Sequence, residues 1–566
     1  MKKIIDFLKN ISVAQLVLIL SILILVIIVA VPVLLILFTA FFENGKLNVA
    51  GVVKVLSDKD TYSALLNSLI IAIGTTFIST LFGVFFAWLV ARTDLPFKKF
   101  MKIMFLVPFM LPSFIGALAW KILLSPNAGY INRLFVKIFN LSSSPIDIMT
   151  MGGIIAIESM YLFPFVFLQV TSALERMDPT LEESARISGA GLFKITTKIT
   201  LPLVLPSILA GALLVALYSL AHFGVPAILG TEKGIYNIPT KIYERIYASA
   251  GSFSAIRIGT ILSTILVISA ALILKAQSML LKRGKFQIIA GKSMRPVVLK
   301  LRGLKTPLFI FCIIYIGITV ILPTVTIFFI GGLKTYGLPI ALESLTWENY
   351  IEIFKWKMTK DSIINSIYLS LSSAFVTMLV GVMISYVIVK MKVKGKFIIE
   401  FLGVLPFSLP GTVIALGVIL TWSGRFGINL YNTAGIIFVA YIARYMAFSL
   451  KSNSAALEQV SDSLEEASRA CGATHWQTLK NIVLPLVRPG MISAFFLIFL
   501  PALRELTTSV LLYGPKTRTI GVAIYALNED GETVRAAALA SVTLVIIFLA
   551  EILIRYFISK LQKQEQ

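Results

Sequence analysis

The chain has 566 residues, of which 57% are hydrophobic, and it carries a formal net charge of +23. Its mean hydropathy is +0.90, and its two cysteines, Cys312 and Cys471, are too few for a disulfide framework or a CxxC metal site. Apolar runs of about 20 residues, the length that crosses the hydrocarbon of a bilayer, recur along the whole chain. The composition therefore excludes an ordinary soluble domain and predicts a membrane protein.

Twelve apolar runs are predicted to be transmembrane helices, and together they predict an all-α membrane fold. The first run is too long for the apolar core of a signal peptide, and no small-residue cleavage site follows it. In chain order the runs cover residues 13–41, 64–90, 100–123, 152–173, 202–228, 255–276, 306–331, 363–389, 398–422, 434–450, 485–511 and 536–558.

Positive charge is concentrated in alternate loops, which indicates membrane topology rather than a nucleic-acid partner. The Lys/Arg excess precedes the first predicted span and follows the second, sixth and eighth spans. By the positive-inside rule these loops face the cytoplasm, so both termini are predicted to be cytoplasmic and the chain to lie in membrane lipid. The residues concerned include Lys2, Lys3, Lys9, Arg92, Lys98, Lys99, Lys102, Lys282, Arg283, Lys285, Lys390, Lys392, Lys394 and Lys396.

The second half of the sequence repeats the first, which predicts a tandem duplication. Landmarks in the second and third spans of each half lie 298 positions apart, whereas landmarks near two later polar segments lie 283 apart. The first half therefore has about 15 extra residues, which we place in the outer loop 125–147. The landmarks at the larger offset are Asn67 and Asn365, Gly83 and Gly381, Pro108 and Pro406, and Pro112 and Pro410.

Six spans in each half place both halves in the same orientation across the membrane, with a pathway expected at their interface. The predicted domains are residues 1–276 and 306–566, joined by a basic cytoplasmic linker at 277–305. Proline pairs interrupt the third span of each half. Either these prolines make ordinary kinks, or they leave unwound backbone beside the pathway.

Two polar segments, 181–203 and 464–486, interrupt the apolar pattern at matched positions. Each has a Glu and two small residues, then a Gly after three further residues, and then a Leu-Pro that opens the next span. We expect a short helix ended by a left-handed glycine, with Phe193 and Trp476 filling a pocket on a partner. The matched residues are Glu183, Ser184, Ala185, Gly189, Leu201 and Pro202 in the first segment and Glu466, Ala467, Ser468, Gly472, Leu484 and Pro485 in the second.

These segments resemble the EAA loop of the permease subunits of binding-protein-dependent ABC importers, although Ser184 and Ser468 stand where Ala is usual. The resemblance implies a type I importer permease fold, built from two parallel six-helix repeats in a prokaryotic cell membrane. It implies that residues 174–202 and 457–485 are coupling loops that dock onto a cytoplasmic ABC ATPase homodimer. It also implies an extracytoplasmic substrate-binding protein that delivers the cargo.

The chain itself is predicted to hold no cofactor and to be no enzyme. The sequence “GKS” at Gly291–Ser293 lacks a Gly five residues before its own Gly, so it is not a phosphate-binding loop. ATP-Mg would therefore be hydrolysed on the partner ATPase. Two other classes stay open. One is a secondary transporter driven by an ion gradient, and the other is a membrane enzyme, for which His222 and His475 suggest no catalytic set.

Ionisable residues inside predicted spans mark a candidate translocation pathway, because such residues are costly in a membrane and usually face a cavity or a partner. His222 and Glu505 are predicted to lie well inside the fifth span of each half, 283 positions apart. A packed pair, in which Arg444 or Arg504 neutralises Glu505, is the alternative. One imidazole and scattered carboxylates lack the spacing of a metal site. The candidates are Glu158, His222, Arg444, Arg504 and Glu505.

Two short stretches point to the cargo. “FGVPAILG” at 223–230 and “REL…LLYGP” at 504–515 resemble the ferric-iron branch of these permeases. The resemblance implies ferric iron as the transported substrate. Relatives of the same architecture carry thiamine, phosphonates or polyamines, so these cargoes stay open.

Overall fold

The computed structural model describes residues 13–43, 45–126, 128–178, 180–249, 252–283, 298–339, 341–391 and 393–564. These residues are helical apart from loops and a two-stranded antiparallel hairpin, β1 (Phe42–Glu43) and β2 (Lys46–Leu47). Among them, ten helices are long and apolar enough to cross a membrane, or twelve if each of two bent pairs is one span. The predicted all-α fold with twelve spans is confirmed. Lys2, Lys3, Lys9, Lys285, Lys392 and Gly291–Ser293 lie outside the described residues.

The helices of the two halves follow one another in the same order. The first half has α2 (Val13–Leu25), η1 (Val26–Ala30), α3 (Val31–Phe41), α4 (Val49–Ser57), α5 (Lys59–Arg92), α6 (Lys98–Met104), α7 (Val107–Met110), α8 (Ser113–Leu124), α9 (Tyr130–Phe139), α10 (Met151–Arg176), α11 (Thr180–Ile187), α12 (Leu192–Ile195), η2 (Thr196–Thr200), α13 (Leu201–Leu220), α14 (Gly224–Leu229), η3 (Thr231–Lys233), α15 (Ile238–Ala248) and α16 (Phe253–Arg283). The second half has η4 (Arg302–Leu304), α17 (Lys305–Ile316), η5 (Gly317–Ile321), α18 (Leu322–Gly331), η6 (Leu342–Ser344), α19 (Glu348–Lys355), α20 (Lys357–Lys390), α21 (Lys396–Val404), η7 (Leu405–Ser408), α22 (Gly411–Trp422), α23 (Ala434–Glu458), α24 (Asp462–Ala470), α25 (His475–Thr478), η8 (Leu479–Val483), α26 (Leu484–Leu503), α27 (Ser509–Leu512), α28 (Ile520–Glu529) and α29 (Thr533–Gln564).

The extra residues of the first half lie where the sequence predicts them. The connection between α8 and α10 runs from Ser125 to Thr150, whereas that between α22 and α23 runs only from Ser423 to Thr433. Helix α9 occupies the longer connection. The insertion therefore enlarges one loop and leaves the order of the spans unchanged.

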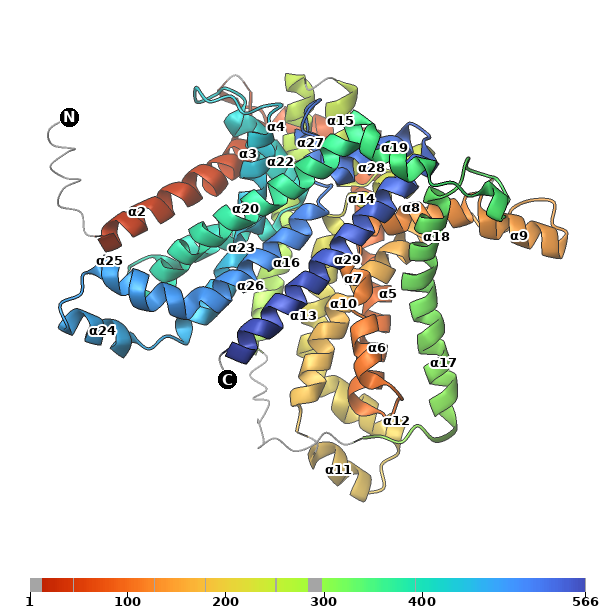
Figure 1. Cartoon of the computed structure of the whole chain (residues 1–566), viewed down its shortest axis with the longest axis horizontal. Helices are drawn as coiled ribbons and strands as arrows, with labels where there is room; N and C mark the ends of the chain where they lie inside the picture. Colours follow the sequence, from red (N-terminus) through yellow and green to blue (C-terminus); the bar gives the residue numbers. More distant parts are fainter. Residues whose placement is uncertain are drawn as a thin grey trace.

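Each half is interlocked with the other through its first long helix. The first span packs Leu25 of α2 and Val29 of η1 against Ile384 and Ile442 of the second half. In return, α17 buries Cys312 in the aromatic cluster around Phe86 of the first half. Figure 1 shows both exchanges, with α2 beside α20 and α23, and α17 beside α5 and α6. The predicted linker at 277–305 thus separates the two halves in sequence, but each hydrophobic cluster contains residues of both halves. The part of this linker up to Arg283 continues α16.

The third span of each half is broken rather than gently kinked. Helices α6 and α7 meet α8 at 90°, and α21 with η7 meets α22 at 115°. The breaks lie at Pro112 and Pro410, which cap α8 and α22. A proline lacks a backbone N–H and disfavours helical backbone in the residue before it. Of the two alternatives for these prolines, ordinary kinks or unwound backbone, the structure shows unwound backbone.

The fifth span of each half ends earlier than predicted, so the prediction of continuous helices over 202–228 and 485–511 is wrong. Helix α13 ends at Leu220 and α26 at Leu503, and the short helices α14 and α27 follow after a break. The apolar residues beyond each break pack in the core without continuing the helix. His222 and Glu505 therefore lie in the breaks, where backbone groups need polar partners.

Candidate functional site

The predicted polar segments form two closely matched helix ends. In the first, the N–H of Gly189 donates to the carbonyl of Arg186 and the N–H of Ala190 to that of Ala185, both at 3.0 Å. In the second, the equivalent bonds join Gly472 to Arg469 and Ala473 to Ser468. Both glycines have positive φ, +81° and +84°. This pattern is the Schellman motif, so the predicted helix with a left-handed glycine is confirmed twice.

Each polar segment is anchored by a buried carboxylate that the sequence analysis did not single out. In the first half, Glu182 lies 3.6 Å from the Arg92 guanidinium and accepts a hydrogen bond of 2.6 Å from Thr200. The side chains of Arg92 and Glu182 are only 0% and 1% exposed. Helix α11 is therefore tied to the end of α5 and to the start of the next span.

The second segment repeats this anchor with different residues. Glu465 accepts a hydrogen bond of 3.1 Å from Tyr386 and lies 3.9 Å from Lys390, which also pairs with Asp462 at 2.6 Å. Glu465 matches Glu182 at the offset of 283, and Lys390 matches Arg92 at the offset of 298. These two matches were the signal in the sequence that could have revealed the anchors.

The opposite faces of the two polar segments are free. Glu183, Ser184, Glu466 and Ala467 are exposed, Ala185 and Ser468 are half-buried, and Gly189 and Gly472 face open space. Phe193 and Trp476 are 82% and 55% exposed. In Figure 1, α11 lies at the bottom of the view and α24 at the lower left, both away from α4, α15 and α19 at the top. The two segments therefore present matched apolar and acidic surfaces on one side.

A cavity of about 200 Å³ lies between the halves, where the broken third span of the first half meets the fifth-span breaks of both halves. Four of the five predicted pathway residues line this cavity: His222, Arg444, Arg504 and Glu505. Residues 283 positions apart thus meet at one place, as expected at the interface of parallel repeats. Ser113, Tyr161, Tyr218 and Tyr445 also line the cavity.

The fifth predicted residue, Glu158, lies behind the cavity wall. It is fully buried. One of its oxygens lies 3.0 Å from Nδ1 of His222, and the other accepts hydrogen bonds from Ser219 at 2.6 Å and Thr75 at 3.3 Å. On the cavity side, Nε2 of His222 lies 2.8 Å from the hydroxyl of Ser113. His222 is therefore held at both nitrogens.

On the opposite wall, Glu505 is held by its own chain and by Arg444. Its carboxylate accepts from the N–H groups of Thr508 at 2.7 Å and Ser509 at 3.0 Å, and Nε of Arg444 lies 3.8 Å away. The ion pair between Glu505 and Arg444 is one of the two packed pairs that the sequence left open. Arg504 instead donates to the carbonyls of Phe109 and Met110 at the broken end of α7.

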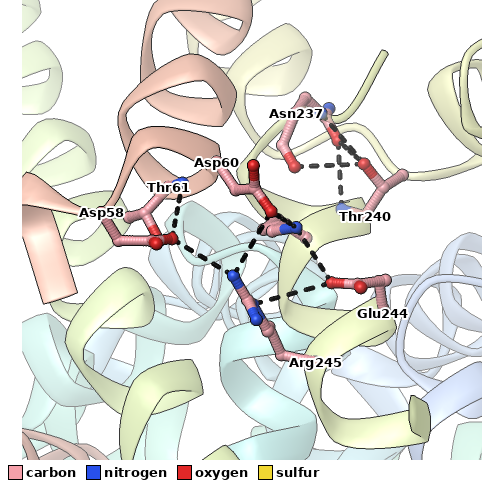
Figure 2. A network of polar contacts seen from close by, with 8 residues as sticks. Asp58, Asp60, Thr61, Asn237, Thr240, Glu244 and Arg245 are labelled. Atoms are coloured by element: carbon pink, nitrogen blue, oxygen red, sulfur yellow. Dashed lines mark hydrogen bonds and ion pairs between the residues drawn. The ribbon is translucent and has the colours of Figure 1, made fainter. Parts of the chain in front are cut away.

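A polar network at the upper end joins α5 to α15 of the first half (Figure 2). Asp58 accepts hydrogen bonds from the N–H and hydroxyl of Thr61 and pairs with Arg245 at 3.2 Å. Partial burial raises the pKa of Asp58, but the bonds from Thr61 and the charges of Arg245 and Lys241 outweigh it and hold the pKa below its usual value. Asn237 and Thr240 form a capping box at the start of α15. The network therefore fixes the start of α15 beside the start of α5.

A family model described as “Binding-protein-dependent transport system inner membrane component” matches residues 79–282 and 377–563. The chain belongs to this family. The two matches agree with the duplication, and they give the chain the role of a multi-pass inner membrane component of a transport system. The family assignment decides against a secondary transporter and a membrane enzyme, although Ser113, His222 and Glu158 are hydrogen-bonded in the order of a hydrolase triad.

Relatives with similar sequences are transport permeases. The “Ferric transport system permease protein FbpB” of Actinobacillus pleuropneumoniae is 28% identical over 92% of this chain and 74% of its own length. A “Putative ferric transport system permease protein FbpB 1” of Haemophilus influenzae is 27% identical over 86% of this chain and 76% of its own. A “Putative 2-aminoethylphosphonate transport system permease protein PhnV” of Salmonella paratyphi A is 27% identical over 33% of this chain and 71% of its own.

Proposed function

We propose that this chain is the fused permease of an ATP-driven importer of ferric iron. Both termini are cytoplasmic, and the membrane is the cell membrane of a prokaryote. The observation that carries the proposal is the matched pair of polar segments, each buried on the side of its anchor and exposed on the other. We now name the two segments the coupling loops. The exposed surfaces of the two coupling loops are similar and lie on one side of the molecule. They would fit a partner with two similar clefts, such as an ABC ATPase homodimer.

Movement of the ATPase would be transmitted from the coupling loops to the cavity through direct side-chain contacts. Glu182 joins the first coupling loop to α5, and Thr200 joins it to the span that ends at the break containing His222. When ATP-Mg closes the partner dimer, the coupling loops approach each other and the two halves rock, opening the cavity outward. A loaded extracytoplasmic binding protein then releases its cargo, and hydrolysis returns the halves. The chain contributes no nucleotide site and no cofactor, and we expect no nucleic-acid partner.

The proposed cargo rests on the relatives, two of which are ferric transport permeases matched over most of the chain. The phosphonate permease matches one third of the chain. A phosphonate is therefore the second candidate, and thiamine and polyamines are the further substrates to assay. The proposed pathway residues are Glu158, His222, Arg444, Arg504 and Glu505, because they lie in or directly behind the cavity between the halves.

The test is ATP-dependent uptake of ⁵⁵Fe into liposomes that contain the chain, its ATPase and its binding protein. The double substitution Glu183→Lys and Glu466→Lys should leave the anchors intact and abolish most uptake, because it reverses the charge of both exposed docking surfaces. The control is Glu400→Lys, an exposed residue on α21 outside both coupling loops. Normal uptake by the double variant would overturn the coupling mechanism, and uptake of 2-aminoethylphosphonate without iron would overturn the cargo.

A further inference from the structure

Helix α9 belongs to the first half alone, since the matching connection of the second half is fully described and contains no helix. In Figure 1 it leaves the bundle near the upper end of α18 and runs outward at the right edge, across the direction of α17 and α18. The hydroxyl of Tyr130 donates to the carbonyl of Leu338 at 3.1 Å. Arg133 donates to the carbonyl of Gly337 at 2.7 Å. The start of α9 is therefore fixed beside the loop that follows α18.

The rotation of α9 about its own axis is fixed by Asn132, which is fully buried. The side-chain amide of Asn132 donates to the carbonyls of Leu124 and Ile146 at 3.1 and 2.7 Å. These bonds join α9 to the end of α8 and to the segment before α10. Because a helix turns once in 3.6 residues, Leu134 and Ile138 lie on the side of α9 that faces away from Asn132.

The free side of α9 combines apolar and basic residues. Leu134, Ile138 and Phe139 are 54%, 62% and 64% exposed. Arg133 and Lys137 are exposed beside them. Such a helix is typical of the membrane interface, where apolar side chains enter the acyl chains and a lysine reaches the headgroups. The basic residues favour an anionic lipid.

The height of α9 along the spans favours lipid over a soluble partner. Helix α8 ends at Leu124, α10 begins at Met151 and α18 ends at Gly331. The hydrogen bonds of α9 reach the chain at or within a few residues of each of these span ends. Helix α9 therefore lies where the spans leave the hydrocarbon, and it runs along the membrane surface rather than away from it. Lipid headgroups are the immediate neighbours at this height.

We propose that α9 is an interfacial helix that binds anionic phospholipid at the membrane surface. Leu134 and Ile138 enter the upper part of the acyl chains, and Lys137 contacts headgroup phosphate. Because Tyr130 and Arg133 hold the loop after α18, α9 also ties the end of a second-half span to this surface. The lipid contact follows from the structure, whereas its assignment to the outer leaflet rests on the proposed topology.

The first test measures depth with a nitrobenzoxadiazole fluorophore on single cysteines of the full chain in lipid nanodiscs. The background is Cys471→Ser, since Cys312 is buried. Labels at Leu134→Cys and Ile138→Cys should show blue-shifted emission and be quenched by lipids with a nitroxide in the upper acyl chain. The control is Ser249→Cys, exposed at the end of α15, which should stay in water. Water-like emission without quenching at both α9 positions would overturn the membrane contact.

The second test measures the preference for lipid charge. Nanodiscs contain equal amounts of phosphatidylglycerol and phosphatidylcholine, and the nitroxide is placed on one or the other. The label at Ile138→Cys should be quenched more by phosphatidylglycerol. Lys137→Gln should lower the relative affinity about fivefold, and Lys54→Gln, an exposed lysine on α4, should leave it unchanged. No preference, or a preference that Lys137→Gln keeps, would overturn the anionic lipid.

A third measurement separates lipid from a protein partner by adding the substrate-binding protein to the nanodiscs. The proposal expects the same emission at Ile138→Cys with and without that protein. If the label lies in water alone and is shielded only when the protein is added, α9 is a protein-docking helix and the membrane proposal fails. These outcomes are independent of ⁵⁵Fe uptake, so failure of the lipid contact leaves the importer function standing, and failure of uptake leaves the lipid contact standing.

Discussion

The two halves of this chain share a scaffold but place opposite charges at its centre. In the first half the acid, Glu158, is on the long helix α10 and the base, His222, is in the break after α13. In the second half the base, Arg444, is on the long helix α23 and the acid, Glu505, is in the break after α26. The acid and the base are not simply swapped between equivalent positions of the repeat. At the offset of 283, Arg444 is equivalent to Tyr161 and not to Glu158.

The coupling loops show the reverse behaviour. Their helix ends, glycines and buried glutamates superpose position by position along the sequence. A symmetric partner with two equal clefts requires two equal loops, whereas one cargo molecule at the interface can be bound by two unlike walls. This difference between the two regions agrees with the proposed function, in which the coupling loops dock onto a symmetric ATPase and one cargo molecule passes between the halves.

The largest expected difference between the halves follows from their central acid–base pairs, Glu158 with His222 and Glu505 with Arg444. Glu505→Gln leaves the Arg444 guanidinium beside a neutral group and weakens the cap of α27, so it should lower the free energy of unfolding by about 3–5 kcal/mol. Glu158→Gln keeps an acceptor for Ser219 and should cost about 1–2 kcal/mol. The melting temperature of each purified variant measures this difference. The double variant Arg444→Gln with Glu505→Gln should recover part of the loss, and equal shifts for both single variants would contradict the comparison.

The anchors of the coupling loops should differ less. Arg92→Met removes the partner of a fully buried carboxylate and should loosen α11 by about 1.5–3 kcal/mol. Lys390→Met removes a partner of the exposed Asp462 and a longer contact with Glu465, which keeps its hydrogen bond from Tyr386, so it should loosen α24 by about 1 kcal/mol or less. Trypsin reports both effects, because Arg186 lies in the first coupling loop and the matched Arg469 in the second. Faster cleavage after Arg469 in Lys390→Met than after Arg186 in Arg92→Met would reverse the expected order.

Most of the architecture could be predicted because it depends on local composition. Apolar runs and the repeat offsets placed the spans, and the glycines placed the ends of both coupling helices. The breaks after Leu220 and Leu503 could not be predicted in this way, since the residues beyond them are apolar whether they continue a helix or fold back. The exchange of α2 and α17 depends on packing between distant segments, which a single sequence does not reveal.

The candidate site was predicted by residue type but not by geometry. Intramembrane charge selected five candidate pathway residues, four of which line the cavity, yet the sequence could not show that Glu158 lies behind His222 rather than in the cavity. In the coupling loops, two consecutive glutamates differ by about 100° around the helix. The prediction selected the exposed members, Glu183 and Glu466, and their docking role stays a prediction. Which glutamate of each pair is buried depends on how the helix is rotated about its axis, and only the structure shows that Glu182 and Glu465 face inward.

A smaller difference lies in the helices after the proline breaks. Ser113 in the first half matches Gly411 in the second, and a Cβ at Gly411 would lie 2.5 Å from Nη1 of Arg444. Gly411→Ser should therefore displace Arg444, at a cost of about 1–2 kcal/mol. Ser113→Gly loses a hydrogen bond to His222, at about 1 kcal/mol, with no direct effect on Arg444. The melting temperatures of both variants test this difference. An unchanged melting temperature in Gly411→Ser would contradict it.

The smallest expected effect concerns the outer ends of the second spans. Asp58 caps α5, whereas the matched Trp356 before α20 provides no side-chain cap. Because the pKa of Asp58 is lowered in the folded chain, its carboxylate stabilises the fold above the usual Asp pKa of about 3.9, and this contribution is lost as the pH falls through the lower folded value. Asp58→Asn should thus lower the melting temperature slightly at pH 7, and the gap from the unsubstituted chain should close below about pH 4. Glu343→Gln, an exposed carboxyl at the same outer end, is the control and should show no such closing gap. A gap that persists at low pH would mean that Asp58 acts by packing rather than by charge.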